Sequence, residues 1–74
     1  MTQAFKEKRT QLREWVLART PGELLTVSTL VGALLGFENG GADIGEPIKD
    51  FLDRLVSEGL LVHEELGYRV ATHP

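Results

Sequence analysis

The sequence predicts a small α+β domain in which three helices are followed by a β-hairpin. Apolar residues recur at helical spacing in three segments, each segment ends at glycine or at a Pro-Gly pair, and two short runs of strand-forming residues close the chain. A chain of 74 residues has room for only one hydrophobic core. We therefore expect a single domain that covers residues 1–74.

The first helix is predicted over residues 4–19. Four apolar residues share one face of it, at spacings of i, i+7, i+10 and i+11: Phe5, Leu12, Trp15 and Val16. We expect this face, including Trp15, to lie in the core. Pro21 and Gly22 end the segment, because the residue before proline avoids the helical conformation and glycine permits a turn. Residues 24–26 are expected to form a short extended segment.

The second helix is predicted over residues 27–36. Its apolar face consists of Leu30, Val31 and Leu34. A hydroxyl of Thr26 or Ser28 is expected to cap the first turn by accepting a free backbone N–H group, and Gly36 ends the helix. The next segment, residues 37–43, contains Asn-Gly-Gly and is expected to be a flexible linker.

The third helix, predicted over residues 45–58, has the clearest pattern of the three. Its apolar residues repeat at i, i+3, i+4, i+7 and i+8: Ile48, Phe51, Leu52, Leu55 and Val56. Pro47 suits a first turn, where a missing N–H group costs nothing, and Gly59 stops the helix. The hairpin is expected over residues 60–71, because two runs of strand formers flank a loop that contains Gly67.

The composition excludes several classes of protein. The absence of cysteine rules out a disulfide scaffold and a thiolate zinc site. The longest stretch without charged residues, residues 24–37, is too short to span a membrane, and the first residues lack the apolar core of a signal peptide. We expect a cytoplasmic protein without membrane contact. Nothing resembles a nucleophile with its base, a phosphate loop or a metal-ligand cluster, so no enzyme activity, cofactor or metal is predicted.

Charge is divided unevenly along the chain. Residues 1–20 hold five cations and two acids (net +3), whereas residues 21–74 hold three cations and nine acids (net −6). Three of the N-terminal cations lie at i, i+3 and i+7, on one side of the first helix: Lys6, Arg9 and Arg13. This basic stripe either contacts phosphate or an acidic partner, or it is simply a solvated helix face.

Two stretches resemble a known fold. Residues 25–34 (LTVSTLVGAL) are similar to the opening of a second helix, and residues 48–61 (IKDFLDRLVSEGLL), followed by GYRV at 67–70, are similar to a recognition helix that runs into a wing. Together with the order of elements, they resemble the winged helix-turn-helix domains of small bacterial and phage transcription regulators. The linker at residues 37–43 is longer than the three- or four-residue turn of a compact helix-turn-helix.

The resemblance implies a transcription regulator whose third helix enters the major groove of double-stranded DNA. The cations expected to contact DNA are Lys49, Arg54 and Arg69, together with Lys6, Arg9 and Arg13. Residues 46, 47, 49, 50 and 53 would face the groove. Three of these five residues are acids, which phosphate repels.

The acids of the third helix support an alternative function. Glu46, Asp50 and Asp53 are predicted on the face opposite the apolar one. They form a solvated face, a docking surface for a basic partner, a divalent-ion site, or a DNA-reading face in spite of their charge. The alternative to DNA binding is therefore a winged-helix module that binds protein, for example an acidic inhibitor of a nucleic-acid enzyme.

The first helix also suggests a homodimer. Leu17 lies beside the basic stripe, on the side opposite the apolar face, where a second copy of the helix can pack. Symmetric dimers match symmetric DNA sites, so the resemblance points the same way.

Overall fold

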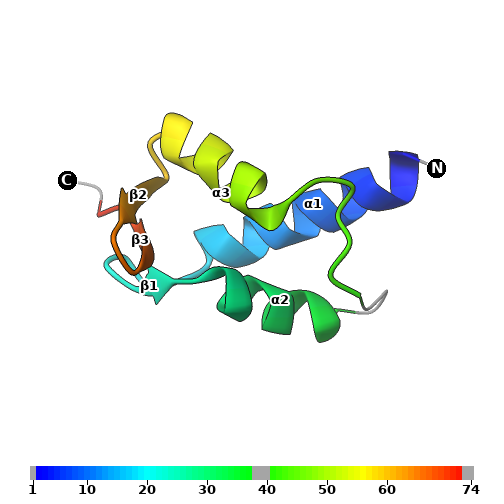
Figure 1. The fold of residues 1–74 in the computed structure, drawn as a ribbon, viewed down its shortest axis with the longest axis horizontal. Helices are drawn as coiled ribbons and strands as arrows, with labels where there is room; N and C mark the ends of the chain where they lie inside the picture. The colour runs from blue at the N-terminus through cyan, green and yellow to red at the C-terminus, as the bar shows by residue number, and fades with distance from the viewer. Residues whose placement is uncertain (1, 38–40, 73–74) are drawn as a thin grey trace.

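The computed structural model describes residues 2–37 and 41–72 and has three helices and a three-stranded antiparallel sheet (Figure 1). The elements follow in the order α1 (Thr2–Leu17), β1 (Leu24–Leu25), α2 (Val27–Leu35), α3 (Ile48–Ser57), β2 (Leu61–Glu64) and β3 (Gly67–Val70). The predicted α+β fold class is confirmed, and the layout is compatible with a three-helix winged helix in which the β2–β3 hairpin corresponds to the wing.

The sheet has the strand order β1-β3-β2. In the hairpin, Leu61 pairs with Val70 and Glu64 pairs with Gly67, so the turn consists of residues 65 and 66. The short segment predicted at residues 24–26 is β1, which pairs with β3 through Leu24↔Arg69. β1 therefore joins the wing to the start of α2, which positions the hairpin relative to the helices.

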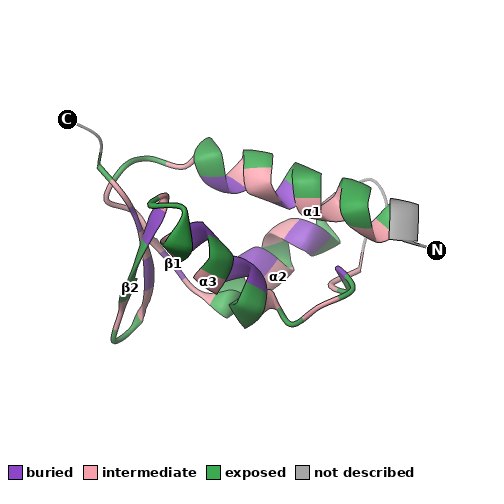
Figure 2. Cartoon of the chain, turned by 90° about the horizontal axis from the view of Figure 1, so that it is seen from above, coloured by how far each residue is buried: buried purple, intermediate pink, exposed green. Residues whose placement is uncertain are grey.

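The core lies between the three helices and the inner face of the sheet (Figure 2). Of the predicted apolar faces of α2 and α3, five residues are buried and three are only partly buried: Leu30, Leu34, Phe51, Leu52 and Leu55, as against Val31, Ile48 and Val56. Leu12 and Val16 of α1 are buried as predicted, and Trp15 is half-buried against the core. Phe5 is only partly buried and lies outside the core cluster, near Gly45. The Arg19 guanidinium covers the exposed side of the Trp15 ring, 4.3 Å from its centre.

Local chemistry fixes the ends of the helices. The Thr26 hydroxyl oxygen accepts from the Thr29 backbone N–H (3.2 Å) and caps α2, one of the two predicted caps. At the end of α3, Gly59 has φ +81°, and its N–H donates to the Val56 carbonyl while the Leu60 N–H donates to the Leu55 carbonyl. This pair of bonds is a Schellman motif, so Gly59 stops α3 as predicted.

Several element boundaries differ from the prediction by one to three residues. The third helix begins at Ile48 rather than at residue 45, because Gly45 has φ +83° and Pro47 has ψ 138°, neither of which is helical. Pro47 therefore occupies the N-cap position, just before the first turn in which it was predicted, and its carbonyl oxygen accepts from the Asp50 and Phe51 N–H groups. α1 occupies residues 2–17 rather than 4–19, and the hairpin strands span residues 61–70 rather than 60–71.

The segment between α2 and α3, residues 36–47, is longer than predicted, because α2 ends one residue earlier and α3 begins three residues later than expected. Phe37 and Ala42 pack against the core, and Ile44 is fully buried. The predicted flexible linker includes residues 38–40, which lie outside the described residues. Ile44 thus anchors the approach to α3, a role that its position in the sequence did not reveal.

Candidate interaction surface around the third helix

The basic stripe of α1 faces α3 across a shallow groove of about 160 Å³. Its floor is formed by Phe51 and Leu55, and its rim by Lys6, Arg9, Thr10, Arg13, Arg54 and Glu58. The prediction that Lys6, Arg9 and Arg13 share one side of α1 agrees with this arrangement. Four cations and one carboxylate line the groove, so its lining is positively charged.

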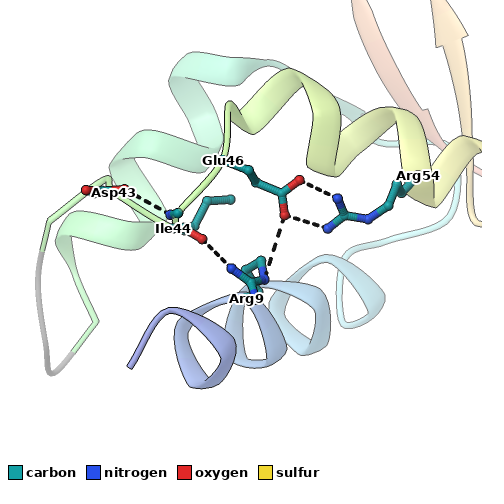
Figure 3. A network of polar contacts seen from close by, with 6 residues as sticks. Arg9, Asp43, Ile44, Glu46 and Arg54 are labelled. Carbon is teal, nitrogen blue, oxygen red and sulfur yellow. Dashed lines mark hydrogen bonds and ion pairs between the residues drawn. The ribbon is translucent and has the colours of Figure 1, made fainter. Parts of the chain in front are cut away.

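Arg9 ties α1 to the segment before α3 (Figure 3). Its Nη1 donates to the Ile44 carbonyl oxygen (2.7 Å), and its Nε lies 3.7 Å from Glu46 Oε2. The Gly45 N–H donates to Asp43 Oδ1 (2.9 Å), which closes a tight turn beside this contact. Arg9 therefore holds residues 44–46 against α1 through these two contacts.

Glu46 lies between two guanidinium groups. Arg54 binds it through both nitrogens of its fork, with Nη2 2.6 Å from Oε2, and Arg9 approaches from the other side. The hydrogen bond from Arg54 is the main cause that lowers the pKa of Glu46, and the charges of both arginines add to it against the effect of burial. Glu46 is therefore a structural carboxylate, ionised at neutral pH.

Arg13 makes a second connection between α1 and α3. Its Nη1 donates to Glu58 Oε2 (2.9 Å), and its Nη2 lies 2.5 Å from Glu58 Oε1, so the pair is bidentate. The hydrogen bond from Arg13 lowers the pKa of Glu58. Both side chains remain about four-tenths exposed, so the pair contributes only modestly to stability.

A separate polar cluster joins α3 to the wing. Asp53 accepts from Lys49 Nζ (2.8 Å) and from the Tyr68 hydroxyl (2.9 Å), and these two bonds lower its pKa. The His63 ring stacks on Tyr68 at 4.5 Å with the rings nearly parallel. Burial, followed by the bond to Asp53, raises the pKa of Tyr68. The cluster fixes the wing against α3 on the side away from α1.

Arg69 lies at the base of the wing rather than at its tip. Its Nε donates to Glu64 Oε2 (2.9 Å), and its Nη1 donates to the Gly22 carbonyl oxygen (2.8 Å). The tip itself carries Glu65 and Leu66, and Leu66 is 78% exposed. The end of the wing is therefore acidic and apolar, and the one wing cation expected to contact DNA, Arg69, is not at the tip.

The structure thus divides the predicted DNA-contact cations into two groups. Arg54 faces the groove beside Lys6, Arg9 and Arg13, whereas Lys49 and Arg69 lie on the wing side. Five of the six hold a carboxylate: Arg9, Arg13, Lys49, Arg54 and Arg69. Lys6 makes no ion pair with any residue that the structure describes.

The three acids predicted to share one face do not come together. Glu46 turns toward α1, Asp53 turns toward the wing, and Asp50 lies exposed between them. The prediction failed for Glu46 because it extended the helical spacing to a residue that precedes the helix. Within residues 2–37 and 41–72, no three histidine or acidic side chains are grouped so that they could hold a metal ion.

Exposed apolar side chains occur on several elements. Leu17, the residue predicted to support a dimer, is 52% exposed at the end of α1. Val62 on the outer side of the wing is equally exposed, and Leu35 of α2 is 60% exposed. None of the described helices combines the length and the apolar character needed to cross a membrane.

Comparison of the chain with protein-family models, with characterised proteins and with solved structures gives no match. Functional inference therefore depends on the surface described above.

Proposed function

We propose that this domain is a winged-helix protein-interaction module whose main contact element is the wing. The observation that carries the proposal is the pairing of cations with carboxylates around α3. A cation that contacts DNA phosphate must first leave its carboxylate, and that carboxylate then faces the phosphate as well.

The net charge of this region supports the same conclusion. Residues 46–69 contain three cations and six acids, a net charge of −3. Breaking every ion pair would leave that sum unchanged, so α3 and the wing together repel a polyanion.

The wing has the chemistry of a protein contact. Val62 and Leu66 are exposed by 52% and 78%. The exposed His63 ring, stacked on the buried Tyr68, belongs to the other face of the same hairpin. Protein interfaces are enriched in aromatic and apolar side chains and depleted of charge at their centre. The cluster around Asp53 holds the hairpin in place, which lowers the entropy that ordering it on binding would cost.

DNA binding by a transcription regulator is the second candidate function. It is favoured by the winged-helix layout and by the cations that α1 and Arg54 place around one groove. In this case the groove contacts phosphate, and α3 makes few base contacts. Either function is consistent with the predicted cytoplasmic location.

A duplex titration separates the two functions. Anisotropy of a labelled mixed-sequence duplex is measured at low and moderate salt, and we expect no binding even at low salt, where counterion release favours it most. Binding that weakens steeply with salt, and that Lys6→Glu removes while Lys8→Glu does not, would establish DNA binding instead.

A capture experiment tests the wing directly. Protein recovered from a lysate of the source cells by the wild-type domain is expected to be lost with Val62→Ser and kept with Leu35→Ser, which changes a similarly exposed apolar residue on α2. Equal recovery by both variants would remove the wing from the proposal.

A further inference from the structure

We propose that the wing tip of a second copy of this chain docks in the groove between α1 and α3. The inference rests on the proposed protein-interaction function and names its partner. Two surfaces of the molecule carry it: a groove with positive charge and an apolar floor, and a tip with negative charge and an apolar side chain.

The groove provides one half of the match. Its volume of about 160 Å³ is close to that of an apolar cavity of about 150 Å³ that holds a benzene molecule, so one aliphatic side chain fits. The floor formed by Phe51 and Leu55 is apolar. On the rim, Arg13 and Arg54 are occupied by Glu58 and Glu46, so Lys6 is the rim cation that keeps its charge available to a partner.

The wing tip provides the other half. Its two turn residues, Glu65 and Leu66, project together beyond the last strand pair, Glu64↔Gly67. Glu64 is held by Arg69, whereas Glu65 makes no ion pair with any described residue. Leu66 is the most exposed of the large apolar side chains described, and the exposed tip points away from the helices in Figure 2. Carboxylate and leucine are therefore adjacent, as the groove requires.

The docked arrangement pairs Glu65 of one copy with Lys6 of the other and places Leu66 over the floor. An exposed ion pair mainly sets orientation, while burial of the leucine supplies the affinity. Reciprocal insertion of two tips closes the assembly at two chains. One-way insertion leaves a free tip and a free groove, so the assembly grows further.

A charge exchange tests the contact. Sedimentation equilibrium of the whole chain across a wide concentration range is expected to show a mass that rises above one chain. Lys6→Glu and Glu65→Lys should each weaken association by about fivefold or more, because each replaces attraction by repulsion. The double variant Lys6→Glu/Glu65→Lys should restore it, and Lys8→Glu should leave it unchanged.

Two exposed leucines locate the apolar contact. Leu66→Ser should weaken association by about tenfold or more, whereas Leu17→Ser should not alter it. Circular dichroism confirms that each variant folds. A wild-type mass of one chain at every concentration would overturn the proposal. So would a double variant that fails to recover, or an association lost with Leu17→Ser and kept with Leu66→Ser.

The outcome is distinguishable from failure of the proposed function, because self-association is measured without DNA. If the chain stays monomeric and does not bind duplex DNA, the second copy is excluded as the partner, and the proposed protein-interaction function still stands. If duplex DNA dissociates the assembly, and the Lys6→Glu variant no longer binds that DNA, the groove is a phosphate-binding site. Both proposals would then be wrong.

Discussion

Replacing two glycines by alanine measures how closely α1 packs on the segment before α3. Gly45 and Gly59 have almost the same φ, +83° and +81°, which costs an L-residue about 1–2 kcal/mol. At Gly59 an added Cβ meets nothing within 4 Å. At Gly45 it would lie 3.0 Å from Phe5 Cδ2 and 3.1 Å from Arg9 Nη1. The two substitutions therefore share their backbone strain and differ in the contact with α1.

The expected magnitudes follow from these distances. Carbon atoms pack best at about 3.5–4.0 Å, so the Phe5 ring must move by about half an ångström to accept the methyl group. Overpacking of this kind costs about 1–3 kcal/mol. Gly59→Ala should lower the free energy of unfolding by about 1–2 kcal/mol, and Gly45→Ala by about 2–5 kcal/mol.

Urea unfolding followed by far-ultraviolet circular dichroism measures both losses, provided that the denaturant slope stays constant. The background variant Phe5→Ala removes the ring but leaves Arg9, so there the excess cost of Gly45→Ala over Gly59→Ala should shrink to what the Arg9 contact contributes. Equal losses in the wild-type background would refute the reasoning. They would mean that Phe5 and Arg9 of α1 do not pack closely against Gly45.

Three further predictions concern stability and titration. Leu55→Ala should cost about 2–5 kcal/mol, a large part of the total of about 4–11 kcal/mol expected for a chain of this length, whereas thermal unfolding of Ser57→Ala should hardly shift. The pKa values of four carboxyl groups are lowered in the folded state: those of Glu46, Asp53, Glu58 and Glu64. Their contribution to the free energy of unfolding is complete above their unfolded-state pKa values of about 4, and it is lost as the pH falls through their folded-state pKa values. The free energy of unfolding should therefore be flat from pH 7 to about 5 and decline below that, less steeply in Glu46→Gln; a decline that begins near pH 6 would contradict this. Tyr68→Phe removes a hydrogen bond that lowers the pKa of Asp53, so that pKa should rise in a carbon-detected NMR titration; an unchanged value would place the hydroxyl elsewhere.

The fold was predictable because its signals are local. The spacing of Ile48, Phe51, Leu52, Leu55 and Val56 is enough to orient α3, and those residues face the core. Gly59 ends the helix for a reason that lies within four residues of it. The β-forming runs around residues 65 and 66 close a hairpin whose register follows from its short turn. None of these features needs knowledge of a distant contact.

The surface was predictable only in part, because its charges are paired across the chain. Arg13 donates a hydrogen bond to Glu58, at a sequence separation of 45 residues. Arg9 donates to the Ile44 carbonyl oxygen, at a separation of 35 residues. The sequence placed Arg9 and Arg13 on one side of α1 correctly, but it contains no sign of what lies opposite them. The sequence likewise predicts only that Tyr68 is a strand residue. Its hydrogen bond to Asp53 could not be predicted, because it depends on how the wing packs against α3.

Glu46 shows how one local departure changes the character of a whole surface. Helical spacing places it beside Asp50 and Asp53, but the positive φ of Gly45 and the extended Pro47 turn its side chain back toward α1. There it binds Arg54, which leaves the outward face of α3 with one acid, Asp50, that has no ion pair among the described residues. A cation predicted for DNA and an acid predicted for a basic partner thus neutralise each other. The surfaces that remain for a partner are the exposed wing tip and the groove between α1 and α3. For this reason the function proposed above involves protein contacts.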